Sequence, residues 1–192
     1  MGALATATRL ASRVGVEFSV LPIGPRLRGI HSFPGGSVRA ETRTFLSSLL
    51  IPGSPALSSG ALLRSEVTLD HYLVSAVTRR HASALAQYSE VTLLKANTTV
   101  TIKRPAGGDW SAVASGVHCS ILNQPMNDPS DKALAIPQYR GPNVVAWGHF
   151  QASVDLKPGD QVVEGSRLYL VSHDLNTSLM DGIVIARMDL RT

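Results

Sequence analysis

The sequence has few of the residues on which most cofactor and metal sites depend. Its single cysteine, Cys119, excludes an internal disulfide framework and any zinc site built from several cysteines. Aromatic residues make up 5% of the chain and charged residues 17%, the latter below the roughly 25% of an average soluble domain. No apolar run approaches the roughly 20 residues of a membrane-spanning helix, so we expect no membrane span.

The short motifs of common catalytic and nucleotide sites are also missing. The sequence has no Gly-rich phosphate loop ending in Lys-Ser/Thr, and no GxGxxG, HExxH, CxxC or GxSxG pattern. Two histidine-based sites remain: zinc held by His118, His149 and His173 with Cys119, and a Cys119–His nucleophilic pair. The strand pattern around Cys119 points it into a core and His118 outward, which argues against both. We therefore expect no enzyme, no cofactor and no metal.

Three carboxylates near one turn are the last catalytic candidates. Asp155, Asp160 and Glu164 could act as a pair of acid and base groups. Charged residues beside a hairpin turn are more often simply solvated surface residues, and we favour that interpretation. His173 and Asp174 are neighbours in a predicted strand, so they face opposite sides and do not orient each other.

The C-terminal stretch from Gly148 to Leu190 predicts four antiparallel strands. Apolar and polar residues alternate from Gly148 to Leu156, as in a half-buried strand. Lys157-Pro158-Gly159-Asp160 predicts a type II turn, because Pro158 presets its own φ and Gly159 accepts a positive φ. Two further strands are predicted before it, at Thr98–Arg104 and Trp110–Leu122. We therefore expect a mainly β chain, with a small antiparallel β-barrel or sandwich over residues 91–192.

A long segment interrupts this pattern at residues 123–147. It contains four prolines and is too long for an ordinary hairpin connection. We expect it to be a loop that projects from the barrel towards a partner.

One amphipathic helix is predicted before the barrel, within residues 66–90. Apolar residues recur at spacings of three and four from Leu69 to Tyr88. Arg79-Arg80-His81 would lie on its polar side, either as a phosphate or partner contact or as a solvated helix face, and we favour the solvated face.

Residues 1–65 carry the chain's basicity. They contain seven arginines and two glutamates, a net charge of +5 in a chain whose total is +4. They are rich in proline, glycine and serine. Two short helices are predicted within them, at Met1–Val14 and Glu41–Leu50. Two interpretations stay open for this extended N-terminal arm: it becomes ordered on a partner subunit, or its first part is a cleaved organellar transit peptide.

The part from Val100 onward resembles the head–tail joining (head-closure, neck or connector) proteins of tailed bacteriophages. The resemblance follows the stretches VTIKRP, GGDWSAVASGV, HFQASVDL, KPGDQVVEGSRLYLV and IVIARMDL, and covers about half of the chain. The residues that match in kind are Trp110, His149, Gly159, Asp160, Gly165, Arg167, Tyr169 and Val171.

The resemblance implies a mechanical role in the virion. Such proteins form a homo-oligomeric ring at the head–tail interface, close the DNA channel below the portal, and present a surface for tail attachment. The implied partners are portal or adaptor proteins and tail proteins, and contact with packaged DNA is compatible with this role. Two alternatives stay open: a tail terminator or other tail adaptor, and an organellar small β-domain that binds a protein or RNA partner.

Overall fold

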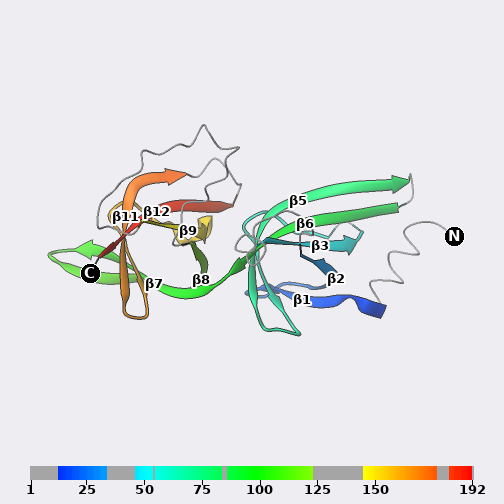
Figure 1. Cartoon of the computed structure of the whole chain (residues 1–192), viewed down its shortest axis with the longest axis horizontal. Helices are drawn as coiled ribbons and strands as arrows, with labels where there is room; N and C mark the ends of the chain where they lie inside the picture. Colours follow the sequence, from blue (N-terminus) through cyan, green and yellow to red (C-terminus); the bar gives the residue numbers. More distant parts are fainter. Residues whose placement is uncertain are drawn as a thin grey trace.

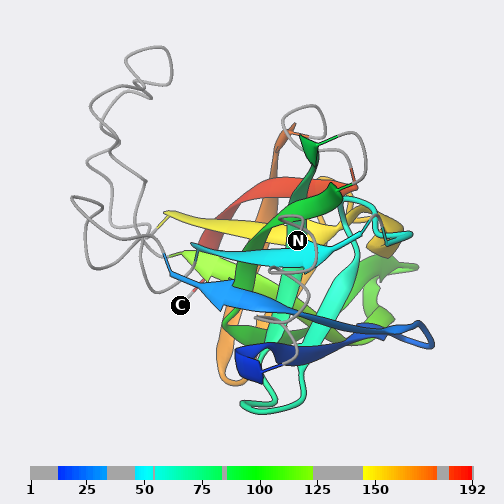
Figure 2. The same ribbon diagram turned by 90° about the vertical axis from the view of Figure 1, so that its right-hand side faces the viewer.

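The computed structural model describes residues 13–33, 46–53, 55–83, 86–122, 145–176 and 182–191. These residues form two closed antiparallel β-barrels of six strands each. The barrels lie side by side along the long axis of the molecule (Figure 1), and Figure 2 looks onto the first barrel. The expectation of a mainly β chain with an antiparallel barrel is confirmed.

The first barrel uses the N-terminal half of the chain. Its strands are β1 (Val16–Leu21), β2 (Arg26–Ser32), β3 (Leu46–Pro52), β4 (Leu62–Ser65), β5 (His71–Ser83) and β6 (Ala86–Ala96). They lie in the order β1-β2-β3-β6-β5-β4, and pairing of β1 with β4 closes the barrel. Closure leaves no free sheet edge, which suits strands as short as β4.

The second barrel repeats this order with the C-terminal half. Its strands are β7 (Thr98–Ala106), β8 (Asp109–Leu122), β9 (Val145–Gln151), β10 (Gln161–Glu164), β11 (Arg167–Asn176) and β12 (Ile183–Arg191), with a short 3-10 turn, η2 (Ala152–Val154), after β9. The order β7-β8-β9-β12-β11-β10, closed between β7 and β10, is that of the first barrel shifted by six strands.

The repetition extends to the turn before the fourth strand of each barrel. In the first barrel, Gly60 has φ +80° and its amide donates to the Val74 carbonyl at 2.8 Å, while the Val74 amide donates to Ala61 at 2.9 Å. In the second barrel, Gly159 has φ +85°. Its amide donates to the Val171 carbonyl, and the Val171 amide donates to the Asp160 carbonyl, each at 2.9 Å. Gly60 and Gly159 therefore occupy equivalent positions.

The fifth strands share sequence as well as geometry. Residues 72–75 and 169–172 both read Tyr-Leu-Val-Ser. Ser75 Oγ donates to the Thr92 carbonyl at 3.1 Å, and Ser172 Oγ donates to the Arg187 carbonyl at 3.0 Å. In both strands a register shift follows the valine of this tetrapeptide. The two halves of the described chain are therefore two copies of one structural unit.

Each barrel has its own apolar core. The first is formed by Phe18, Leu27, Leu49, Ile51, Leu57, Leu63, Tyr72, Val74, Val91 and Leu93. The second is formed by Val100, Ile102, Cys119, Ile121, Ala146, Phe150, Leu156, Val162, Tyr169, Val171, Ala186 and Met188. The two cores are separate, so each barrel is a packing unit of its own.

The predicted amphipathic helix at Leu69–Tyr88 is wrong: this segment forms β5 and the start of β6. Tyr72 and Val74 point into the first core, but Leu73, on the opposite face, is also fully buried, against the second barrel. With both faces of the strand apolar, the alternation expected of a half-buried strand disappears. The apolar residues of this segment then recur at spacings of three and four, which is the pattern of a helix.

The expected N-terminal arm is also corrected. Within residues 1–65 the structure describes four strands, β1 to β4, and Phe18 and Leu63 are completely buried in the first core. Of the helix predicted at Glu41–Leu50, the described part, residues 46–50, belongs to strand β3. Prolines and glycines mark the barrel's tight turns here. Residues 1–12 and 34–45 lie outside the described residues. All but the last two residues of the helix predicted at Met1–Val14 therefore lie outside them as well.

The four predicted C-terminal strands are present as β9 to β12. The first of them ends earlier than expected, at Gln151, where η2 begins. The predicted loop at 123–147 is shorter at its end, because Val145–Trp147 belong to β9, and residues 123–144 lie outside the described residues. The pairing of β7 with β8 shifts register on both sides of Ile102, and Val113 of β8 is 47% exposed while Cys119 of the same strand is buried.

Replacement of Phe18 tests whether the N-terminal segment is core or arm. Phe18→Ala should lower the free energy of unfolding by about 3–5 kcal/mol, as expected when a buried aromatic side chain is truncated. The exposed Ile23, with 98% of its surface accessible, is the matched control, and Ile23→Ala should leave stability nearly unchanged. Chemical denaturation measures both, and equal stability of Phe18→Ala and the parent would contradict a core at this position.

Candidate functional site

The two barrels are joined by a single residue, Asn97, between β6 and β7. Its side chain forms two hydrogen bonds with the backbone of Ile121 in β8: Nδ2 donates to the carbonyl and the Ile121 amide donates to Oδ1, both at 2.8 Å. A one-residue connection fixed in this way leaves little freedom for one barrel to turn against the other.

Backbone packs directly on backbone where the barrels meet. A Cβ built on Gly60 would lie 2.2 Å from the Gly182 carbonyl oxygen, and one built on Gly182 would lie 2.3 Å from the Ser59 carbonyl oxygen. Gln151 Nε2 donates to the Gly60 carbonyl at 2.8 Å, and the Ala152 amide donates to Gly182 at 2.9 Å. Only glycine permits this approach at the two contact points.

An apolar cluster seals the junction beside these glycines. Leu62, Leu73 and Leu94 point outward from the first barrel and are at most 7% exposed, and Ile183 of the second barrel is 1% exposed. Further apolar residues pack against this cluster from both barrels: Leu21, Leu46 and Ile185. The junction is thus a third hydrophobic core, formed by the outer faces of the barrels.

Two histidines stack across the same junction. The rings of His71, at the start of β5, and His118, in β8, are 3.7 Å apart between centroids and 12° from parallel. Burial lowers the pKa of both imidazoles, and for His71 the nearby His118 and Arg64 lower the pKa further against an opposing effect of Asp70. The pair is therefore neutral near pH 7, which allows the rings to stack.

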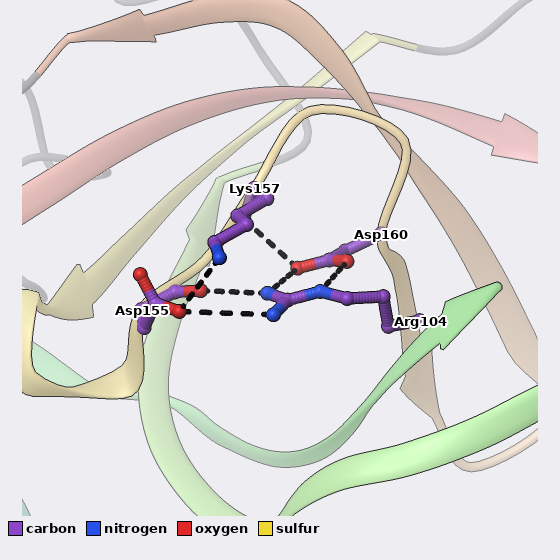
Figure 3. A network of polar contacts seen from close by, with 4 residues as sticks. All are labelled: Arg104, Asp155, Lys157 and Asp160. Atoms are coloured by element: carbon purple, nitrogen blue, oxygen red, sulfur yellow. Dashed lines mark hydrogen bonds and ion pairs between the residues drawn. The ribbon is translucent and has the colours of Figure 1, made fainter. Parts of the chain in front are cut away.

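The second barrel has a network of charged groups at its equivalent turn (Figure 3). Asp160, 1% exposed, accepts hydrogen bonds from Arg104 Nε at 2.8 Å and Arg104 Nη2 at 2.9 Å, and from the Lys157 amide at 2.8 Å. Arg104 Nη2 also donates to the Asp155 carbonyl at 2.8 Å. The hydrogen bonds from Arg104 to Asp160 raise the pKa of the guanidinium, and the network fixes the turn on β7.

The two equivalent turns differ in what covers them. The Gly60 turn packs against the second barrel, whereas a Cβ added at Gly159 would meet no atom within 4 Å. The side chains of Asp155 and Lys157 are 71% and 53% exposed and pair with each other at 3.2 Å. The face of the second barrel around Gly159 is thus a copy of the junction face of the first barrel, with charges added and with no other barrel packed on it among the described residues.

Among the described residues, the histidine and cysteine candidates form no group that could hold a metal ion. Cys119 is completely buried, and burial raises the pKa of its thiol to about 12, so that it is an unreactive core residue at neutral pH. His118 lies outside the core, stacked on His71, as its strand position predicted. His149 is 6% exposed, and burial lowers its pKa. The side chains of His173 and Asp174 lie outside the described residues.

The acidic and basic candidates are divided between several contacts. Asp155 and Asp160 are held together through Arg104, and Glu164 accepts a hydrogen bond from the Tyr169 hydroxyl at 3.1 Å. A shared ion pair with arginine suits a structural carboxylate better than a catalytic acid and base. Arg79 and Arg80 are exposed on β5 rather than on a helix, and Arg80 pairs with Glu90 at 3.4 Å.

The residues that carry the family resemblance mostly build the second barrel. Tyr169 and Val171 are core residues, and Gly165 takes φ +56° in the β10–β11 turn. Arg167 lies beside Glu164, with 3.8 Å between the charged atoms, and Trp110 is 41% exposed near the β7–β8 turn. The pattern therefore marks a way of building a barrel rather than a single binding site.

Comparison of the chain with protein-family models, with curated proteins and with solved structures found no match. Among the described residues no group of three or more histidine, cysteine, aspartate or glutamate side chains is placed to hold a metal ion. A search of the same residues for a helix long and apolar enough to cross a membrane found none.

The junction and its repeated face were missed in the sequence. The signal that indicates them is the tetrapeptide Tyr-Leu-Val-Ser, which occurs at residues 72–75 and again at 169–172. In each copy it pairs with the strand that follows a glycine of positive φ, Gly60 or Gly159. A search for internal repeats would have aligned the two halves on this tetrapeptide.

The Arg104–Asp160 ion pair should be a major stabilising contact of the second barrel. Asp160→Ala removes three hydrogen bonds and leaves Arg104 without its main partner. We expect a loss of about 3 kcal/mol in unfolding free energy, at the lower end for a buried pair because the Arg104 side chain is 28% exposed. As a control, Lys157→Met breaks only the exposed contact with Asp155 and should cost less than about 1 kcal/mol. Equal losses in denaturant titrations would contradict this assignment.

The stacked histidines predict that acid weakens the junction. Their folded-state pKa values lie below the unfolded value of about 6.5, so the unfolded chain binds more protons and stability falls as the pH drops below about 7. His31 and His149 have lowered pKa values too and add to this slope. The double variant His71→Asn/His118→Asn should therefore show a shallower loss of unfolding free energy between about pH 7.5 and pH 5. An unchanged slope would contradict the role of the stack.

Proposed function

We propose that the chain is a structural protein of a tailed-bacteriophage virion, a subunit of the neck ring that joins the portal to the tail and helps to close the DNA channel. The observation that carries the proposal is the resemblance in sequence of the part from Val100 onward to the neck family, at residues that form the turn, core and hairpin of the second barrel. Gly159 and Asp160 lie in the anchored turn, and Tyr169 and Val171 lie in the core behind it.

The rigidity of the described chain supports a mechanical role. Each barrel is closed, the connection between them is one hydrogen-bonded residue, and a buried apolar cluster holds their outer faces together. A subunit that resists the pressure of packaged DNA must transmit force without internal hinges. Such a tandem of barrels meets that requirement.

Hairpins that reach beyond the barrels offer surfaces for neighbouring proteins. Strands β5 and β6 extend past the other strands of the first barrel (Figure 1), and β5 alone has 13 residues. In the second barrel, Trp110 and Val113 of β8 are 41% and 47% exposed. Exposed aromatic and aliphatic side chains on a projecting hairpin are typical of protein contacts.

Loss of the protein from its virus tests the proposal. A virus that lacks this chain should package DNA, lose it again through the unclosed channel, and release heads and tails separately, because the ring that closes and joins them is missing. Electron microscopy of the lysate, together with detection of the chain in intact wild-type particles, measures this. Tailless but sealed heads would favour a tail terminator or adaptor role, and absence of the chain from purified particles would contradict the proposal.

A further inference from the structure

We infer that the chain binds a second copy of itself head to tail, by repeating between chains the contact that joins its two barrels. The inference rests on the proposed ring and specifies how the ring is built. The Gly159 face of the second barrel in one chain would receive the β3–β6 end of the first barrel in the next.

The internal junction shows that two different faces of the same unit bind each other. One is the outer face around the Gly60 turn, called here the turn face, and the other is the end of the third and sixth strands around Gln151 and Gly182, called the end face. The first barrel uses its turn face and the second uses its end face. Each barrel therefore retains the face that the other has used.

Strand register identifies the residues of the unused turn face. In the first barrel Leu62 pairs with Leu73, and Leu73 pairs with Leu94. In the second barrel Gln161 pairs with Leu170, and Leu170 pairs with Asp189 in the same way. Leu21, which pairs with Leu62, corresponds to Lys103, which pairs with Gln161. The unused turn face of the second barrel thus consists of Lys103, Gln161, Leu170 and Asp189 around Gly159.

The unused end face follows from the same comparison. The bond from Ala152 to Gly182 in the second barrel has its counterpart in the bond from Gly53 to Gln87 in the first, also at 2.9 Å. Ile183 and Ile185, which meet the first barrel, correspond to Tyr88 and Glu90. A Cβ built on Gly53 would meet no atom of the described residues within 4 Å, so none of them covers this point of the end face.

The charges of the two unused faces are complementary. Lys103 takes the place of Leu21 on one face, and Glu90 takes the place of Ile185 on the other. Asp189 on the turn face has a basic counterpart in Arg80, which lies opposite Tyr88 and pairs with Glu90 at 3.4 Å. Opposite charges at equivalent places of a repeated contact favour pairing of two chains over other partners.

The polar character of these faces fits a contact formed only on assembly. The internal junction is permanent and is therefore built from leucine and isoleucine, as in an obligate interface. Faces that stay in water until a second chain arrives need polar groups, and non-obligate interfaces are about as polar as the rest of the surface. A head-to-tail contact between two different faces closes into a ring when its rotation allows.

A charge swap tests this contact directly. Glu90→Lys and Lys103→Glu should each weaken self-association of the full chain by about tenfold, because each places like charges across the contact. The double variant, which has both changes in every chain, restores opposite charges and should associate like the parent. Sedimentation velocity and native mass spectrometry over a concentration series measure the association.

Glu17→Lys is the matched control. Glu17 is 45% exposed and pairs with Arg28, much as Glu90 is 46% exposed and pairs with Arg80, but it lies at the opposite end of β1 from Leu21. This variant should associate like the parent. If both single variants, Glu90→Lys and Lys103→Glu, associate as strongly as the parent, the head-to-tail contact is wrong, and the neck proposal is not affected. A parent chain that stays monomeric at every concentration would also overturn the contact, whereas the neck proposal fails separately if virions lack the chain.

Discussion

The close approach of Gly60 to Gly182 is the constraint on which the arrangement of the whole molecule depends. Any side chain at either position would overlap a carbonyl group of the other barrel. Because the backbones meet without side chains between them, the leucines and isoleucines beside them close into a buried cluster. The single linking residue, Asn97, and the histidine stack then hold an orientation that the glycines permit.

The repeated unit explains why the chain holds two barrels with the same strand order. Each copy contributes six strands, a glycine turn fixed by two backbone hydrogen bonds, and a serine that bonds across the fifth and sixth strands. What differs between the copies is the chemistry around the turn. Ala61 of the first turn is replaced by Asp160 in the second, where Arg104 from β7 supplies the countercharge.

Much of the second barrel could be predicted from the sequence, because its strands face water on one side. The Lys157–Asp160 turn, the core position of Cys119 and the four C-terminal strands follow from turn chemistry and alternation. The first barrel could not be predicted in this way. Leu62, Leu73 and Leu94 are apolar on the outside because another barrel covers them, so alternation is lost and a helix is predicted instead. The Arg104–Asp160 pair spans 56 residues, and no local pattern indicates it.

Amide hydrogen exchange on the isolated full-length chain tests the tandem barrel most directly. If residues 16–65 belong to a closed barrel, the amides of Phe18 and Leu63 are protected to a degree similar to those of Val100, Val162 and Val171 in the second barrel. That result would establish two folded copies of one unit. Exchange of residues 16–65 at the rate of an unfolded peptide, with protection confined to the second barrel, would contradict the repeat and every conclusion drawn from it.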